Sequence, residues 1–85
     1  MIRFTRHARE KFVILRRHGI VISEPAVIRA IADPEVIDNS RESLKIAQRT
    51  FDKMRVLRVV YKEIGGDDKL VITFYPGRKK QYGKP

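Results

Sequence analysis

The chain has 85 residues, 42% of them hydrophobic, and this size predicts one domain, residues 1–85, with a single compact core. It has no cysteine, which excludes disulfides, thiolate catalysis and zinc sites built on cysteine. Nineteen lysines and arginines oppose ten acidic residues, and the resulting net charge of +9 attracts polyanions such as nucleic acid.

The same composition argues against several other classes of protein. Its apolar runs are far shorter than the roughly 20 residues that a membrane-spanning helix needs, so no membrane partner is expected. The first residues carry arginines without the long apolar stretch of a secretion signal, which predicts a cytoplasmic address. Two histidines and ten scattered carboxylates predict no metal site and no cofactor.

The positive charge is concentrated in three zones of the sequence, residues 1–19, 41–65 and 76–85. If the fold brings these zones together, they form one surface for a polyanion. If it does not, each zone is an ordinary solvated face. Charge alone leaves both interpretations open.

The first expected elements are a short strand and a helix. Apolar alternation predicts the strand over Ile2–Phe4. Thr5 is a good capping residue for a helix that starts at Arg6 and ends near His18. Gly19 then suits the left-handed position that commonly follows a helix. The apolar stripe of this helix consists of Ala8, Phe12 and Leu15.

A second helix is expected to begin after Ser23, which can cap it, and Pro25 is tolerated in its first turn. Asp33 and Pro34 end this helix, because the residue before a proline is pushed out of the helical region. Its apolar stripe consists of Val27, Ile28 and Ile31.

After Pro34 the hydrophobic period changes from that of a helix to the period of two that strands show. Strands are expected over residues 35–38, 44–51, 54–64 and 70–75. The sequence Gly65-Gly66-Asp67-Asp68 predicts a hairpin turn, and Pro76-Gly77 predicts the end of the last strand. The order predicts an α+β domain, with two N-terminal helices packed on one face of a three- to four-stranded, mainly antiparallel sheet.

Several local strings follow one another in an informative order. They are Phe4-Thr5-Arg6-His7-Ala8-Arg9-Glu10-Lys11, Arg17-His18-Gly19-Ile20, Ser23-Glu24, Asp33-Pro34, Leu57-Arg58-Val59-Val60-Tyr61, and Val71-Ile72-Thr73 followed by Arg78. In order and spacing they resemble the RelE-like superfamily of small bacterial and archaeal toxins. The chain is most similar to its BrnT-like branch and to BrnT-related proteins without an established activity, and the resemblance covers most of the chain.

The resemblance implies a toxin that cleaves messenger RNA, often on the ribosome, and that a partner antitoxin protein silences. RelE-type toxins use arginine or lysine from the middle strands, an arginine after the last strand, and a tyrosine or histidine near the C-terminus. In this chain those residue types are Arg58, Arg78 and Tyr82. The chain departs from the related branch at Lys11, where that branch often has arginine.

The composition suits cleavage of RNA without a metal. In that reaction a base takes the proton of the 2′-hydroxyl, cations stabilise the charge on the phosphoryl oxygens, and an acid protonates the leaving 5′-oxygen. Arg58, Arg78 and Tyr82 are the catalytic candidates. His7 joins them because a histidine can act as acid or base near neutral pH, although it can equally have a structural role in the first helix.

Four further cations, Arg49, Arg55, Lys79 and Lys80, are candidates for contacts with RNA. Arg49 and Arg55 flank a tight connection between strands, where the alternative is a solvated, protected sheet edge. Lys79 and Lys80 lie close to Tyr82, so that the cations can hold phosphates while the ring stacks on a base. The alternative for this segment is a frayed tail.

Two other functions remain open for the same fold. One is a non-catalytic module whose basic surface binds nucleic acid or a protein partner. The other is an inactive relative retained for its interaction with another protein. Convergence of Arg58, Arg78 and Tyr82 on one open sheet face would favour the ribonuclease. The sequence does not indicate an oligomeric state.

Overall fold

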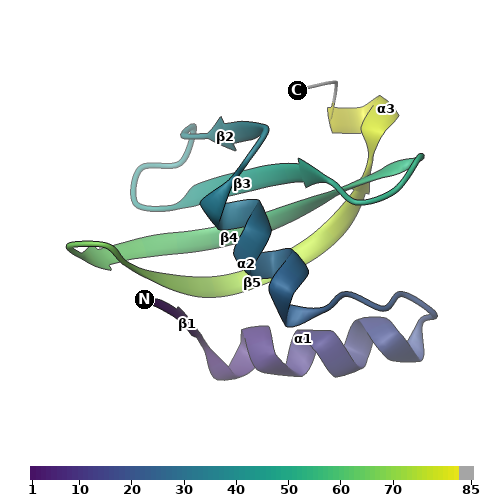
Figure 1. The fold of residues 1–85 in the computed structure, drawn as a ribbon, viewed down its shortest axis with the longest axis horizontal. Coiled ribbons are helices and arrows are strands. Elements are labelled where there is room, and N and C mark those ends of the chain that lie inside the picture. The colour runs from purple at the N-terminus through teal and green to yellow at the C-terminus, as the bar shows by residue number, and fades with distance from the viewer. Residues whose placement is uncertain (83–85) are drawn as a thin grey trace.

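The computed structural model describes residues 1–82 and contains a five-stranded sheet with two helices on one face (Figure 1). In Figure 1, helix α2 passes in front of the sheet and helix α1 lies along its lower border. The expected α+β class is confirmed, but the expected number of strands, three to four, is wrong. The elements are β1 (Ile2–Phe4), α1 (Arg6–Arg17), α2 (Glu24–Ala32), β2 (Val36–Asp38), β3 (Lys45–Thr50), β4 (Arg55–Gly65), β5 (Asp68–Arg78) and α3 (Lys79–Tyr82).

The strand order in the sheet is β1-β5-β4-β3-β2. Strands β2 to β5 pair antiparallel, whereas β1 pairs with β5 in parallel. The two outer strands, β1 and β2, have three residues each. Both lie where short strands were expected, at residues 2–4 and 35–38. The sequence does not show that both join one sheet, so the expected sheet is too narrow.

Strand β5 continues through Pro76 and Gly77 to Arg78, beyond its expected end. Pro76 pairs with Leu57 of β4. Proline has no N–H to donate and is therefore confined to sheet edges and bulges. β1 pairs only with residues 69–71 of β5, so β5 is itself an edge strand at Pro76 and has no further neighbour on its outer side.

The two long helices begin and end as the sequence predicts. The side-chain oxygen of Thr5 accepts a hydrogen bond of 3.0 Å from the N–H of Ala8, and that of Ser23 accepts one of 3.2 Å from the N–H of Ala26. Gly19 follows α1 with a φ of +81°, in the left-handed region that favours glycine. Capping and turn chemistry are local, so they could be predicted without knowledge of the tertiary structure.

The main core lies between the sheet and helices α1 and α2. Phe74 and Val59 contribute fully buried side chains from the sheet, and Val27 contributes one from α2. The ring of Phe12 on α1 lies against Phe74, with the ring centroids 4.6 Å apart. Each large apolar side chain buried in this way contributes about 1.5–3 kcal/mol. The two helices thus cover this face of the sheet. We call the opposite face, which neither long helix covers, the open face.

The last described residues form a short helix, α3, instead of a frayed tail. The backbone N–H of Lys79 donates a hydrogen bond of 2.9 Å to the carbonyl oxygen of Met54. This bond attaches the start of α3 to the turn between β3 and β4, and so fixes where Tyr82 can lie.

A helix of the length and apolarity needed to cross a membrane does not occur in residues 1–82.

Candidate active site on the open sheet face

Strand β4 sends alternate side chains to opposite faces of the sheet. Leu57, Val59 and Tyr61 belong to the core under the helices. Because successive strand residues point to opposite faces, Arg58 lies on the face that α1 and α2 leave open. It projects there between the buried side chains of Val56 and Val60.

Arg58 is the most buried cation that the structure describes, with 8% of its surface exposed. Its Nε donates a hydrogen bond of 3.1 Å to the hydroxyl oxygen of Tyr75. One terminal nitrogen donates to Oε1 of Gln48, and the other lies 3.5 Å from Oδ2 of Asp38. A guanidinium has five N–H donors, so these three contacts fix the group in place and leave two donors for a ligand.

The ring of Tyr82 stacks on this guanidinium, with the Cζ atom of Arg58 4.2 Å from the ring centroid. Gly77 makes the stack sterically possible. A Cβ atom at position 77 would lie 2.3 Å from Cε2 of Tyr82, closer than any real contact. The absence of a side chain at Gly77 thus places α3 over the sheet. We call Asp38, Gln48, Arg58, Tyr75 and Tyr82 the open-face cluster.

Asp38 is the anionic member of the open-face cluster. Hydrogen bonding to Ser40, whose backbone N–H lies 2.8 Å from Oδ1, is the main cause that lowers the pKa of Asp38 below its ordinary value of 3.8. The positive charge of Arg58 lowers the pKa further. Asp38 is therefore ionised at neutral pH, and its carboxylate can accept a proton or a hydrogen bond beside Arg58.

The structure brings together only two of the four catalytic candidates, Arg58 and Tyr82. The sheet register pairs Arg78 with Arg55, so the two side chains share the helix-covered face of the sheet. His7 is exposed in the first turn of α1, on that same side. Arg78 and His7 are thus separated from Arg58 by the sheet itself.

Two of the four cations expected to bind RNA are engaged in ion pairs within the chain. A terminal nitrogen of Arg49 donates to the backbone carbonyl of Asp33 at 2.7 Å and lies 3.2 Å from its carboxylate, which ties β3 to the end of α2. Arg55 pairs with Asp52 at 2.8 Å within the β3–β4 turn. Both arginines thus have structural contacts within the chain.

The other two cations, Lys79 and Lys80, line a hollow of about 570 Å³ at the end of the sheet. Lys53 from the β3–β4 turn and Arg78 from β5 add two more cations, and the chain of Met54 supplies apolar surface. None of these four cations makes an ion pair with another described residue. We call this set the edge hollow; it adjoins α3, which carries Tyr82.

Sequence reasoning missed three members of the open-face cluster, Asp38, Gln48 and Tyr75. One signal was available for Gln48. It lies two residues after the apolar Ile46, and since residues two apart in a strand share a face, a polar side chain there interrupts an apolar row. Tyr75 carried no signal that distinguishes packing from a site. Asp38 lies near Arg58 because the edge strand β2 pairs with β3, and no local sequence pattern defines the register of that pair.

Residues 1–82 contain no group of three histidine, cysteine or acidic side chains placed to hold a metal ion.

Comparison of the chain with protein-family models, with curated proteins and with solved structures found no match. The resemblance to RelE-like toxins thus rests on the sequence strings alone, and the candidate site rests on its own geometry.

Proposed function

We propose that this protein is a RelE-like endoribonuclease that cleaves RNA without a metal at the open-face cluster and is controlled by a partner antitoxin. The observation that carries the proposal is the stack of Tyr82 on Arg58, beside the ionised Asp38. These residues are distant in sequence, and they unite a cation, a phenol and a carboxylate on one open face.

The three groups match the three needs of RNA transesterification. Asp38 takes the proton of the 2′-hydroxyl, whose oxygen then attacks the adjacent phosphorus. The two free N–H donors of Arg58 stabilise the charge that develops on the phosphoryl oxygens. The hydroxyl of Tyr82 gives its proton to the leaving 5′-oxygen. The products are a 2′,3′-cyclic phosphate and a 5′-hydroxyl, so no oxidant, metal or cofactor is required.

Tyr75 and Gln48 have positioning roles in this mechanism. Each accepts one hydrogen bond from Arg58 and so holds the plane of the guanidinium. The ring of Tyr82 lies over one face of the guanidinium, so the substrate phosphate must reach the free N–H groups beside the ring. We therefore expect Tyr82 to shift when RNA binds.

The test is cleavage of a short single-stranded RNA by the purified full chain with a chelator present throughout. We expect cyclic-phosphate products, and we expect Tyr82→Phe, which keeps the ring on Arg58, to lower the rate at least tenfold. Tyr61→Phe is the matched control, because Tyr61 is a buried tyrosine on the helix side of the sheet. Equal rates for Tyr82→Phe and the wild type would refute the assignment of Tyr82.

A growth assay tests the biological part of the proposal. Induced expression of the wild type should arrest growth with fragmented messenger RNA, whereas an Arg58→Lys/Tyr82→Phe double variant should not. Co-expression of a cognate antitoxin should restore growth. If the double variant folds and still arrests growth, the toxicity does not depend on this site.

A second function, a non-catalytic basic module that binds nucleic acid, is favoured by the edge hollow. The four cations there lack ion-pair partners within the described chain, while Arg58 is largely enclosed by its own neighbours. RNA that binds and stays intact under all conditions would support this function over the ribonuclease.

A further inference from the structure

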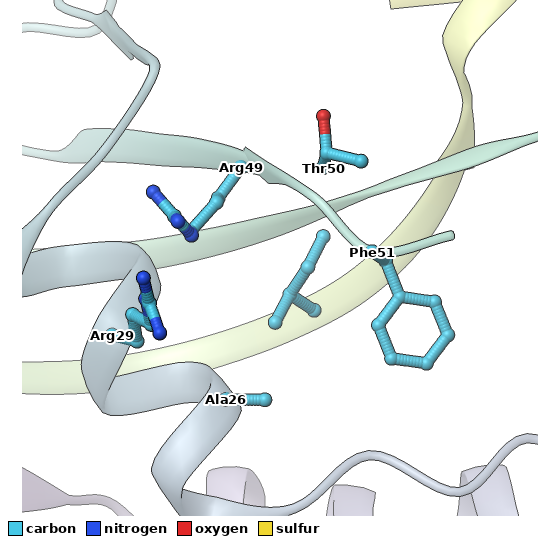
Figure 2. A pocket seen from close by; sticks show the side chains of 6 residues that line it. Ala26, Arg29, Arg49, Thr50 and Phe51 are labelled. Atoms are coloured by element: carbon cyan, nitrogen blue, oxygen red, sulfur yellow. The ribbon is translucent and has the colours of Figure 1, made fainter. Parts of the chain in front are cut away.

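A second hollow lies on the opposite side of the sheet from Arg58, between helix α2 and strands β3 and β4. Its volume is about 280 Å³. Figure 2 shows its side chains, which come from three separate elements and the segment after β3. They are Ala26, Arg29, Arg49, Thr50, Phe51 and Leu57.

Two guanidinium groups share one side of this hollow. Arg29 extends from α2 and Arg49 from β3, and in the view of Figure 2 both guanidinium groups lie on the same side of the hollow. Asp33 holds one terminal nitrogen of Arg49 through its carbonyl and its carboxylate. Arg29 has no acidic side chain within ion-pair distance among residues 1–82. Arg49 thus already has an acidic partner, whereas Arg29 is the cation of this hollow that is left to attract an anion.

The rest of the hollow is apolar. Leu57 is 2% exposed and belongs to the main core, and Ala26 and Phe51 pack against that core. The hydroxyl and the N–H of Thr50 are already bound to the carboxylate of Glu35. A ligand that fits this lining has an anionic end and an apolar or aromatic body.

We propose that this hollow binds a nucleotide, with its phosphate between Arg29 and Arg49 and its base or sugar over Leu57 and Phe51. A phosphate monoester carries a charge of about −1.5 to −2 and three strong acceptor oxygens, which match two guanidinium groups. A carboxylate has one charge and two oxygens, and Asp33 already supplies one carboxylate. The volume is near the lower limit of ligand pockets, about 300–1,000 Å³, so it suits a single nucleotide.

This site is separate from the open-face cluster. Gln48 and Arg49 are consecutive in β3, so one points to Arg58 and the other to the hollow on the far side of the sheet. Binding at the hollow therefore needs no catalysis at Arg58, and each site can fail its test without the other.

The experiment is a titration of the full chain, followed by amide chemical shifts, with adenosine 5′-monophosphate, adenosine or inorganic phosphate. We expect the monophosphate to bind most tightly, phosphate more weakly, and adenosine at least tenfold more weakly than the monophosphate. Arg29→Gln should weaken monophosphate binding at least tenfold and leave the fold intact, because Arg29 is exposed. Arg16→Gln, an exposed arginine near the end of α1, is the matched control and should bind like the wild type.

Short RNAs with and without a 5′-terminal phosphate identify the source of the nucleotide. If only the phosphorylated RNA displaces the bound monophosphate, and does so better than free monophosphate, the hollow binds an RNA end. If the phosphorylated RNA displaces it no better than free monophosphate, the hollow binds a mononucleotide. The proposal would be overturned if Arg29→Gln bound the monophosphate as tightly as the wild type does. It would also be overturned if a glutamate-rich peptide displaced the monophosphate at a lower concentration than phosphate does. The Tyr82→Phe variant should bind the monophosphate normally.

Discussion

At the scale of single residues, the open-face cluster depends on Gly77, because a larger residue there would displace Tyr82. Gly77 leaves the space in which the ring of Tyr82 lies against Arg58. The aromatic stack of a cation at this distance contributes about 0.5–2 kcal/mol, depending on how far it is desolvated. The position of the Tyr82 ring over Arg58 therefore requires a residue without a side chain at position 77.

We predict that Gly77→Ala displaces Tyr82 from Arg58, because the added methyl group and the ring cannot occupy the same space. The measurement is the ring-current shift of the Arg58 Nε–H resonance, which should move toward its ring-free value, together with a fall in RNA cleavage. Gly66→Asn is the control, since position 66 has open space around it and a φ of +53° that asparagine tolerates. An unchanged Nε–H shift in Gly77→Ala would contradict the steric argument.

Asp38 makes a second residue-scale prediction, on stability in acid. Its pKa is lowered in the folded chain, chiefly by hydrogen bonding to Ser40. Its stabilising contribution is therefore fully present above the unfolded pKa, near 3.9, and is lost as the pH falls through the lower folded pKa. Urea unfolding between about pH 5 and about pH 2 should show a smaller loss of stability in Asp38→Asn than in the wild type.

Asp67→Asn is the matched control for that measurement. Asp67 lies in the turn between β4 and β5, and its side chain makes no ion pair with a described residue. It should keep the acid loss of the wild type, part of which comes from the lowered pKa values of Asp52 and Glu63 beside Arg55 and Lys45. Identical pH curves for all three proteins would show that Asp38 makes no such contribution.

At the scale of elements, Thr5 connects the start of α1 to the sheet. Its Oγ1 accepts from the N–H of Ala8 and also donates a hydrogen bond of 3.1 Å to the carbonyl oxygen of Ile72 in β5. We predict that Thr5→Ala lowers the free energy of unfolding by about 1–2 kcal/mol, measured by urea denaturation. Thr5→Ser keeps the hydroxyl and should lose less than half as much. Equal losses would indicate that the methyl group, not the cap, is responsible.

The positions of the helices and strands along the chain could be predicted from local signals, and the pairing of the strands could not. The caps at Thr5 and Ser23, the helix end before Gly19 and the hairpin at Gly65-Gly66 all involve neighbouring residues. Short strands were expected at residues 2–4 and 35–38, where β1 and β2 lie. Their places at the two edges of the sheet, and the continuation of β5 past Pro76, depend on which strands become neighbours. That information lies in long-range packing and not in periodicity.

The candidate site shows the same limit. Alternation within one strand is enough to put Arg58 on the same face as Val56 and Val60. Its partners Gln48 and Tyr75 follow only once the register of the neighbouring strands is known. The register also puts Arg78 on the other face, beside Arg55. This could not be predicted, because the strand was expected to end at residue 75, before Arg78. Because β5 continues for three more residues, the alternation of faces extends to Arg78, which was expected to lie outside the strand.

At the scale of the whole molecule, the net charge of +9 makes salt the main external control of RNA binding. Each phosphate contact to single-stranded RNA adds about −0.7 to the slope of log affinity against log salt. We predict that a Lys53→Ala/Lys80→Ala double variant, changed only in the edge hollow, binds with a slope shallower by about 1.4. Fluorescence anisotropy at several salt concentrations measures this slope.

The control for that measurement is an Arg16→Ala/Arg17→Ala double variant, which loses the same charge from the last turn of α1. It should lower affinity slightly at low salt and keep the wild-type slope, because α1 lies on the covered side of the sheet. The same change of slope in both variants would show that RNA responds to total charge and does not contact the edge hollow.

The parallel pairing of β1 with β5 also dictates when the protein can fold. Ile2 pairs with Lys69 and Phe4 with Val71, so β1 has to wait until the much later strand β5 is made. At about 5–20 residues per second, translation leaves these apolar side chains and the stripe of α1 uncovered for several seconds. We expect nascent chains arrested before residue 68 to remain sensitive to protease, and the domain to become resistant only when β5 is complete.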